Sequence, residues 1–374
     1  MATSAVIIGN PSARSGAGTA LSIPSLDGIR ALSFAIVFVS HAGLEAVVPG
    51  GFGVTVFFFL SGYLITTLLR KEWQEHDTIS FRAFYFRRVL RILPPFYIVL
   101  LVAISLTLAN LLPGELRTSS VAAQALHFAN YWMAARGSDG FPPGTGVYWS
   151  LAVEEHFYLL FPGFYYLLRR VGLSSRRQAH VFWMVCGLVL LWRAVVAFSF
   201  ENPALWTFVA TDCRLDSILF GCAMAVYNNP FLDPMRSDTA ERQRRIWLPL
   251  ALVGLLVSMV WRDPTFRATL RYTLQGVCLY PVFVVAIRYP NWKWIRWLNL
   301  GWLRQIGAMS YSLYLVHQIL LVAVEYRLPT LSPLVRAALA FALAMLFSQA
   351  LLVLVEKPCA NLRRSWLRKP VPAA

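Results

Sequence analysis

The run GIRALSFAIVFVSHAG occupies residues 28–43, and its composition indicates the class of fold. Arg30 and His41 are its only ionisable side chains, and an apolar helix of roughly 20 residues is long enough to cross the hydrocarbon of a bilayer. The whole chain of 374 residues is 57% hydrophobic and 14% charged, whereas soluble domains are about 45–50% apolar and about 25% charged. The sequence therefore predicts an all-α, polytopic membrane protein.

Apolar stretches of spanning length recur along nearly the whole chain. A shorter apolar segment at 120–134 is expected to form a re-entrant or interfacial helix, because it is too short to span. The remaining stretches predict about ten transmembrane helices, near residues 29–48, 52–70, 93–112, 149–168, 181–199, 212–228, 246–261, 272–288, 307–326 and 334–355.

The formal net charge of +16 would suggest nucleic-acid binding in a soluble protein, but the basic residues lie in short segments between the predicted spans. With both termini in the cytoplasm, the cytoplasmic segments hold 24 of the 34 lysines and arginines, and the outside loops hold seven. This asymmetry is the positive-inside pattern. We therefore expect an integral protein of the cytoplasmic (inner) membrane, in contact with the lipid bilayer and not with nucleic acid.

Three regions are expected along the chain. Residues 1–25 form a disordered cytoplasmic tail, residues 26–358 the transmembrane domain, and residues 359–374 a basic cytoplasmic tail. The small residues before position 25 precede the first apolar run, whereas a signal-peptide cleavage site would follow it. We therefore expect the first helix to be retained.

Arg30 and His41 are the first ionisable residues within a predicted span, where each charged group costs at least ~2.5–3.5 kcal/mol on insertion scales. Eleven residues advance an ideal α-helix by three turns plus roughly 20°, so both side chains would lie on one face, ~16 Å apart. The spacing favours a shared functional face. The alternative is that Arg30 extends to the headgroups and His41 bonds a neighbouring helix.

The run VYWSLAVEEHFYLLFP at 147–162 places polar residues at the start of the fourth predicted span. Glu154 shares a helix face with Ser150 and Tyr158, which lie four residues before and after it. This polar stripe is expected to face a cavity. The alternative is that the acidic residues lie at the outer surface and stabilise the helix N-terminus.

The run FRAFYFRRVLRILPPFY at 81–97 places Arg88 and Arg91 on one helix face, three residues apart. Paired guanidinium groups suit the binding of phosphate. The positive-inside rule alone is the alternative explanation for these two residues.

Four further polar residues in predicted spans are expected to line a cavity. Arg214 lies between Asp212 and Asp216, and we expect it to pair with one of them or with another helix. The other three could equally serve helix packing or core hydrogen bonds; they are Ser61, Tyr314 and His317.

Seven motifs together resemble the acyltransferase 3 family of integral membrane acyltransferases, over roughly residues 24–358. They occur in the family's order and are SLDGIRALSFAIVFVSHAG, GVTVFFFLSGYLI, FYFRRVLRILPPFY, YWSLAVEEHFYLLFP, RLDSILFG, SYSLYLVHQ and EKP. The resemblance implies ten spans, an acyl-coenzyme A donor bound from the cytoplasm, and transfer of an acyl group, usually acetyl, to a hydroxyl. Acceptors in the family include sugars of lipopolysaccharide, peptidoglycan and lipo-oligosaccharides, and macrolides. Some relatives carry a fused SGNH hydrolase-like domain, so we expect this sequence to represent the stand-alone form, acting directly or with a separate periplasmic partner.

The expected activity is transfer of acetyl or another short acyl group from acyl-coenzyme A, with acetyl-coenzyme A the expected donor, to a carbohydrate or glycoside hydroxyl. Arg30, Arg88 and Arg91 would bind the anionic donor. His41 would be the general base or an acyl-carrying nucleophile, and Glu154 would orient it or move a proton. No metal is expected. Two alternatives stay open: a transmembrane acyl carrier that feeds a separate periplasmic transferase, and a proton-coupled transporter.

Overall fold

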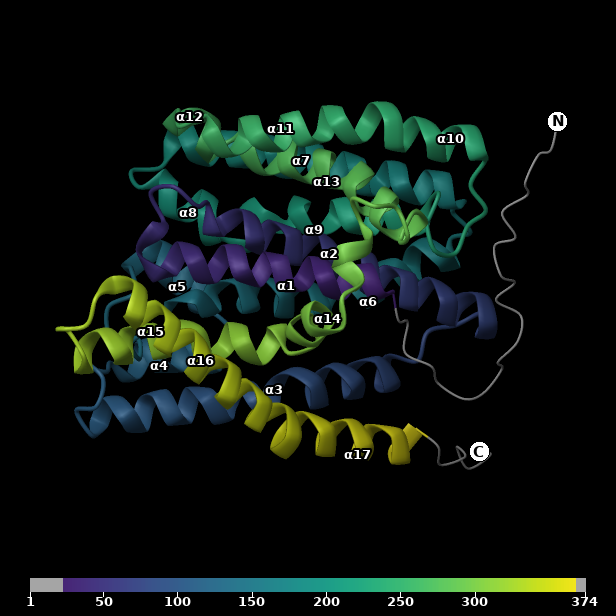
Figure 1. Ribbon diagram of the computed structural model, residues 1–374. Coiled ribbons are helices and arrows are strands. Elements are labelled where there is room, and N and C mark those ends of the chain that lie inside the picture. The colour runs from purple at the N-terminus through teal and green to yellow at the C-terminus, as the bar shows by residue number, and fades with distance from the viewer. Residues whose placement is uncertain (1–22, 368–374) are drawn as a thin grey trace.

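The computed structural model describes residues 23–367, so most of the predicted tail at 1–25 and the last residues of the tail at 359–374 lie outside the described residues. Within 23–367 all regular secondary structure is helical and no strand occurs. The long helices run side by side, and α1 begins at the same end of the bundle at which α17 ends (Figure 1). The predicted all-α fold is confirmed.

Each of the ten predicted spans overlaps a helix of 13 to 28 residues. These helices are α1 (Pro24–Val39), α2 (Gly50–His76), α3 (Phe81–Leu108), α6 (Trp149–Arg170), α7 (Ser175–Ser199), α9 (Thr211–Val226), α11 (Leu248–Val260), α13 (Leu270–Arg288), α15 (Ser310–Arg327) and α16 (Pro333–Leu351). Seven helical segments of the described chain are long and apolar enough to cross a membrane, or eight if α14 (Gly301–Ala308) and α15, bent by 73°, form one span.

Two of the ten helices are in neither the seven segments nor the bent pair. They are α6, which carries Glu154 and Glu155, and α9, which has 16 residues. The chain is therefore an integral membrane protein with seven or eight candidate spans. The number of ten spans and the cytoplasmic position of both termini stay predictions.

Short helices gather at the two ends of the bundle. The end away from the start of α1 carries α4 (Thr118–Ala125), α5 (Ala129–Arg136), α8 (Pro203–Val209) and α12 (Pro264–Ala268) (Figure 1). The segment predicted as re-entrant or interfacial at 120–134 is thus two short helices, separated at His127, whose φ is +57°. α10 (Ser237–Arg242) and α17 (Lys357–Leu367) lie at the other end.

α17 covers the described part of the predicted C-terminal tail. Its Trp366 ring lies 4.2 Å from the Phe86 ring of α3, measured between centroids, and the Arg82 guanidinium lies 4.9 Å from the Trp366 centroid. Residues 357–367 are therefore a helix packed on α3.

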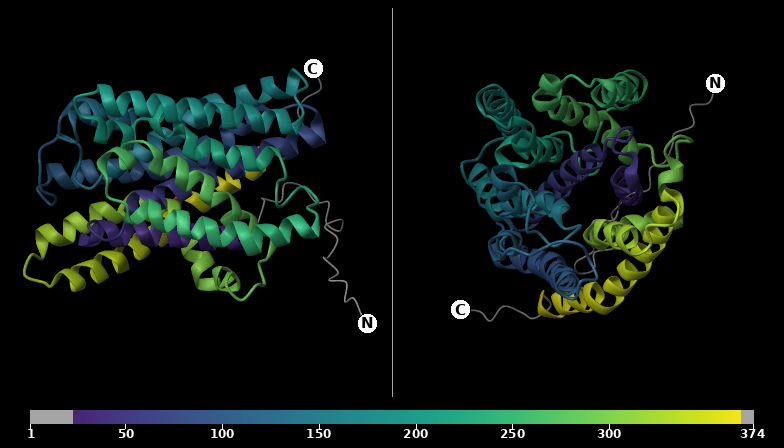
Figure 2. Two further views of the ribbon diagram at one scale, coloured as in Figure 1. Left: turned by 90° about the horizontal axis from the view of Figure 1, so that it is seen from above. Right: turned by 90° about the vertical axis from the view of Figure 1, so that its left-hand side faces the viewer.

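α1 and α2 lie in the middle of the bundle, as the view along the helices shows (Figure 2). α2 packs against α9 through a glycine from each helix. A Cβ on Gly62 would lie 2.0 Å from the backbone oxygen of Ile218, and a Cβ on Gly221 would lie 2.0 Å from the backbone oxygen of Phe59. Small residues let membrane helices approach to backbone contact. The two glycines therefore set the distance between α2 and α9.

The predicted orientation in the membrane can be tested with single cysteines at the two ends of α7. In a background that lacks Cys359, the partly exposed native cysteine, we expect Ser175→Cys to react with an impermeant thiol reagent only from the cytoplasm. Asn202→Cys should react only from outside, because the positive-inside bias places that end there. The reverse pattern of labelling would contradict the ten-span topology.

Candidate functional site

α1 ends in a π-helical turn, Ser40–Leu44, that contains His41. Ala42 and Gly43 leave the helical region of backbone space, and Gly43 has φ +100°, which glycine adopts without strain. A π turn changes the angular spacing of side chains and occurs frequently at functional sites. The break in the helix thus follows His41, since Ser40 is still helical, and the expectation that Arg30 and His41 share one face stays a prediction.

His41 contacts a second histidine, His317 of α15. Nδ1 of His41 lies 3.0 Å from Nε2 of His317, and the two rings are nearly parallel, with an interplanar angle of 14°. His317 is fully buried, and its Nδ1 lies 2.8 Å from the backbone oxygen of Tyr314. The histidine pair, His41 and His317, thus joins the first predicted span to the ninth.

His41 also lines a cavity of about 340 Å³ at the end of the bundle away from the start of α1. The wall is mainly the loop between α5 and α6, and the lining residues are His41, Met133, Ser138, Phe141, Pro142, Pro143, Gly144, Gly146, Val147, Trp149 and Gln318. Because Nδ1 of His41 is taken by His317, Nε2 is the ring nitrogen left for a ligand in this cavity.

The cavity loop is held in place at two points. The Gln124 side-chain amide donates a hydrogen bond to the backbone oxygen of Thr145 at 3.1 Å. Gly144, at φ +78°, lies directly against α15, where a Cβ would be 2.5 Å from Cα of Ile319. The loop is therefore packed on the turn of α15 that follows His317.

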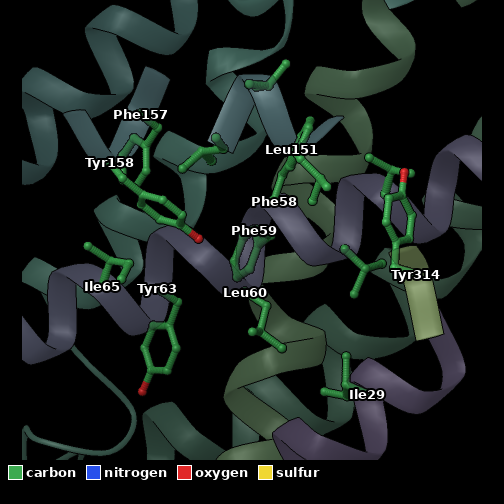
Figure 3. Close-up of a cluster of buried hydrophobic side chains, with 14 of the residues drawn as sticks. Ile29, Phe58, Phe59, Leu60, Tyr63, Ile65, Leu151, Phe157, Tyr158 and Tyr314 are labelled. Atoms are coloured by element: carbon green, nitrogen blue, oxygen red, sulfur yellow. The ribbon is translucent and has the colours of Figure 1, made fainter. Parts of the chain in front are cut away.

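The histidine pair is one polar group, and a second lies around Tyr158. Figure 3 shows Tyr158 and Tyr314 to either side of Phe58, Phe59 and Leu60 of α2. Arg88, Arg30 and Arg91 all lie near enough to Glu154 to interact with it electrostatically. The Arg88 guanidinium lies 5.4 Å from the centroid of the Tyr158 ring. We call Arg30, Arg88, Arg91, Glu154 and Tyr158 the arginine–glutamate cluster. It brings together the three arginines that the sequence predicts as ligands of an anion.

Two hydroxyl pairs complete these polar groups. The Ser61 and Tyr158 hydroxyls lie 2.5 Å apart, beside Glu154. The Ser150 and Tyr314 hydroxyls lie 2.7 Å apart. All four side chains were expected to line a cavity, which stays a prediction; each is buried and contacts the other member of its pair on a neighbouring helix.

The polar stripe predicted on α6, Ser150, Glu154 and Tyr158, connects the histidine pair with the arginine–glutamate cluster. Ser150 contacts Tyr314, whose ring centroid is 5.4 Å from that of His317. Two turns further along α6, Tyr158 contacts Arg88. Glu154 lies between them on the same helix face and belongs to the arginine–glutamate cluster.

Glu154 does not make the expected contact with His41. Among residues 23–367, the side chain that hydrogen-bonds His41 is His317, and Glu154 lies beside Ser61 of α2 and the arginines. The reason is the rise of α6: one turn separates Ser150, which reaches the α15 side, from Glu154, which faces α2 and α3.

Arg214 does not line the cavity. Its guanidinium is 3.9 Å from the Tyr272 ring centroid and 5.6 Å from that of Trp149, and it donates to Thr55 Oγ1 at 3.0 Å. The side chain is fully buried behind Trp149, which itself lines the cavity. Arg214 therefore supports a wall of the cavity from behind.

Of the two partners expected for Arg214, an aspartate of its own helix or another helix, the structure shows the second, because Arg214 donates to Thr55 of α2. Asp216 pairs with Arg193 of α7 at 2.9 Å, with both side chains fully buried. Asp212 accepts a hydrogen bond from the Tyr131 hydroxyl at 2.9 Å. Both carboxylates thus bind neighbouring helices, and Arg214 is enclosed by aromatic rings.

Two parts of the cavity wall, the loop between α5 and α6 and Gln318, were not predicted from the sequence. The signal was present in the run FPPGTG at 141–146, whose glycines and prolines mark a turn directly before the fourth predicted span. Composition alone gave no reason to connect this turn with His41, which is a hundred residues away in the chain.

Comparison with known proteins places these observations in a family. A family model described as "Acyltransferase domain" matches residues 23–353. The peptidoglycan O-acetyltransferase OatA of Listeria monocytogenes is 28% identical over 308 residues, which cover 79% of this chain and 49% of that protein. The O-acetyltransferase OatA of Staphylococcus aureus is 29% identical over 320 residues, which cover 81% of this chain and 51% of that protein. No solved structure matches the chain significantly.

The chain thus spans about half the length of these curated relatives. The residues matched by the family model include the histidine pair, the arginine–glutamate cluster and the loop between α5 and α6 that lines the cavity.

Proposed function

The chain belongs to the acyltransferase family whose model matches residues 23–353, and from this premise we propose that it transfers acetyl, or another short acyl group, from acyl-coenzyme A to a carbohydrate or glycoside hydroxyl. The observation that carries the proposal is the stripe on α6, which connects a cluster of three arginines to a histidine at a cavity. The relatives named as O-acetyltransferases support the choice of an oxygen acceptor and an acetyl group.

The arginine–glutamate cluster is proposed to bind the phosphates of the donor. Arg30, Arg88 and Arg91 lie near enough to Glu154 to interact with it electrostatically, and Arg30 is paired with Asp27 at 2.7 Å. Guanidinium groups bind phosphate in a bidentate manner. Acetyl-coenzyme A would then enter from the end of the bundle at which α1 begins, the cytoplasmic end in the predicted topology of an inner-membrane protein.

The cavity beside His41 is proposed to bind the acceptor. Its volume of about 340 Å³ lies in the usual range of small-molecule sites, about 300–1,000 Å³. Trp149 and Phe141 offer apolar faces to a sugar ring, and Nε2 of His41 is free to take a hydroxyl proton. The hydroxyl oxygen then forms a bond to the acyl carbon, the carbon–sulfur bond breaks, and the proton passes to the thiolate of coenzyme A.

The test is to incubate the purified protein with acetyl-labelled acetyl-coenzyme A and with candidate acceptors: muropeptides, lipopolysaccharide and a macrolide. We expect an alkali-labile label on one acceptor and release of an equal amount of free coenzyme A. Label that stays on the protein would favour an acyl carrier that needs a separate periplasmic partner. Movement of a solute into proteoliposomes without covalent change would favour a transporter.

Removal of one donor-binding arginine should weaken donor affinity. Arg91→Ala loses one charge-assisted contact, ~1.5–3 kcal/mol, which is about a 10–150-fold weaker affinity for acyl-coenzyme A. Isothermal titration in detergent measures this affinity. The matched control is Arg176→Ala, an exposed arginine at the start of α7 on the same side of the bundle. If both variants bind acyl-coenzyme A with equal affinity, Arg91 does not bind the donor, and the positive-inside rule alone explains its position.

A further inference from the structure

We propose that His317 is a positioning residue that fixes the tautomer of His41, through hydrogen bonds that begin at the backbone carbonyl of Tyr314. The proposal rests on the proposed function, because it concerns the ring nitrogen of His41 that faces the acceptor. Its geometric basis is a chain of two contacts: Tyr314 oxygen to Nδ1 of His317 at 2.8 Å, and Nε2 of His317 to Nδ1 of His41 at 3.0 Å.

The first contact fixes the proton on His317. A carbonyl oxygen can only accept a hydrogen bond, so Nδ1 of His317 carries the hydrogen and donates it to Tyr314. In a neutral imidazole the other nitrogen, Nε2, is then an acceptor.

The surroundings of His317 favour this neutral ring. It is fully buried, with the Phe34 ring edge-on at 5.7 Å and the Phe38 ring at 6.5 Å between centroids. In the described part of the chain no carboxylate is hydrogen-bonded to it. A buried imidazolium without a paired anion would be strongly unfavourable.

The second contact fixes the proton on His41. Because Nε2 of His317 is an acceptor, Nδ1 of His41 must carry the hydrogen and donate it. The lone pair of His41 is therefore on Nε2, the nitrogen left for the cavity. Both proposed roles of His41 need this tautomer, since a general base and a nucleophile each act through an unprotonated nitrogen. In the other tautomer Nε2–H would face the acceptor and could neither take a proton nor attack.

Two packing features hold His41 and His317 in contact. The π-helical turn at Ser40–Leu44 presents His41 to α15, and the glycine contact of Gly144 packs the cavity loop on the next turn of α15. Partners that fix the tautomer of a metal-bound histidine typically contribute about 10–100-fold in metal affinity or activity, and we expect an effect of this order for His41.

Two substitutions of His317 separate positioning from packing. His317→Gln keeps an amide oxygen that can reach the position of Nε2 and accept from His41, whereas His317→Leu has similar bulk and no acceptor. We expect His317→Leu to lower kcat by about 10–100-fold with little change in the KM for acetyl-coenzyme A, and His317→Gln to retain most of the wild-type kcat. Acyl-coenzyme A affinity, measured by titration, serves as the control for folding, because the arginine–glutamate cluster is separate from the pair.

A direct readout needs no turnover at all. Solid-state NMR of the wild-type protein with ¹⁵N-labelled histidine should show a protonated Nδ1 and an unprotonated Nε2 for His41, with assignment by the His41→Asn variant. His317→Leu should convert His41 to a mixture of tautomers.

Three results would overturn the proposal: wild-type kcat in His317→Leu, equal loss in the Gln and Leu variants, or a protonated Nε2 of His41 in the wild type. Failure of the proposed function looks different. In that case the wild-type protein would transfer no acyl group, while the NMR signals would still report which nitrogen of His41 is protonated.

Discussion

Replacement of His41 by alanine should lower turnover by ~10²–10⁴-fold, the usual contribution of general acid–base catalysis, and should leave the affinity for acyl-coenzyme A nearly unchanged. The reason is the separation of the two polar groups along α6. His41 lines the cavity proposed to bind the acceptor, whereas the arginines proposed to bind the donor lie near Glu154. Loss of a group that acts only in the reaction lowers kcat and kcat/KM together.

The measurement compares acyl transfer under single-turnover conditions with donor titration on the same preparation. His180→Ala is the matched control, because His180 is an exposed histidine of α7 that lies away from both polar groups. A His41→Ala protein that binds donor and turns over near the wild-type rate would remove His41 from the chemistry. A parallel loss of donor affinity would instead place the donor phosphates beside the histidine pair.

The second large effect concerns folding. Gly62→Leu should abolish the folded protein, because the first side-chain carbon would lie 2.0 Å from the backbone oxygen of Ile218. Overpacking of a core costs typically 1–3 kcal/mol, occasionally more, and here the opposing atom belongs to helical backbone and cannot rotate away. We therefore expect a cost above ~3 kcal/mol and no monodisperse peak when the detergent extract is examined by gel filtration.

The control for this substitution is Gly187→Leu, on the exposed face of α7, where a Cβ would meet no atom within 4 Å. It should extract and elute like the wild type. Gly221→Leu, on the opposite side of the same contact, should repeat the effect of Gly62→Leu. Normal elution of either variant would mean that α2 and α9 can move apart without loss of the fold.

The helices were predictable because hydrophobic length is a local property. Every predicted span overlaps a helix, and the stripe of Ser150, Glu154 and Tyr158 on α6 follows from the helical period alone. The end of α1 was not predicted, since a straight helix was assumed through His41. The π turn depends on backbone geometry at Ala42 and Gly43, which periodicity does not report.

The pairing of side chains across helices could not be predicted from a single sequence. His41 and His317 are 276 residues apart in the chain, and each alone reads as a polar residue in a span. The same limit left two partners open for Arg214, an aspartate of its own helix or another helix: Asp216 pairs with Arg193, and Arg214 donates to Thr55 of α2. Local spacing could not decide between these partners because it carries no information about which helices are neighbours.

The polar residues of α6 also affect the order in which the two polar groups assemble during synthesis of the chain. A nascent helix that contains Glu154 and Glu155 enters hydrocarbon poorly by itself, because each charge costs at least ~2.5–3.5 kcal/mol on insertion scales. α2 and α3 leave the ribosome earlier, and they bring Ser61 and Arg88, which lie beside this part of α6. The arginine–glutamate cluster can therefore assemble co-translationally, whereas the histidine pair is completed only when α15 emerges, well after α6.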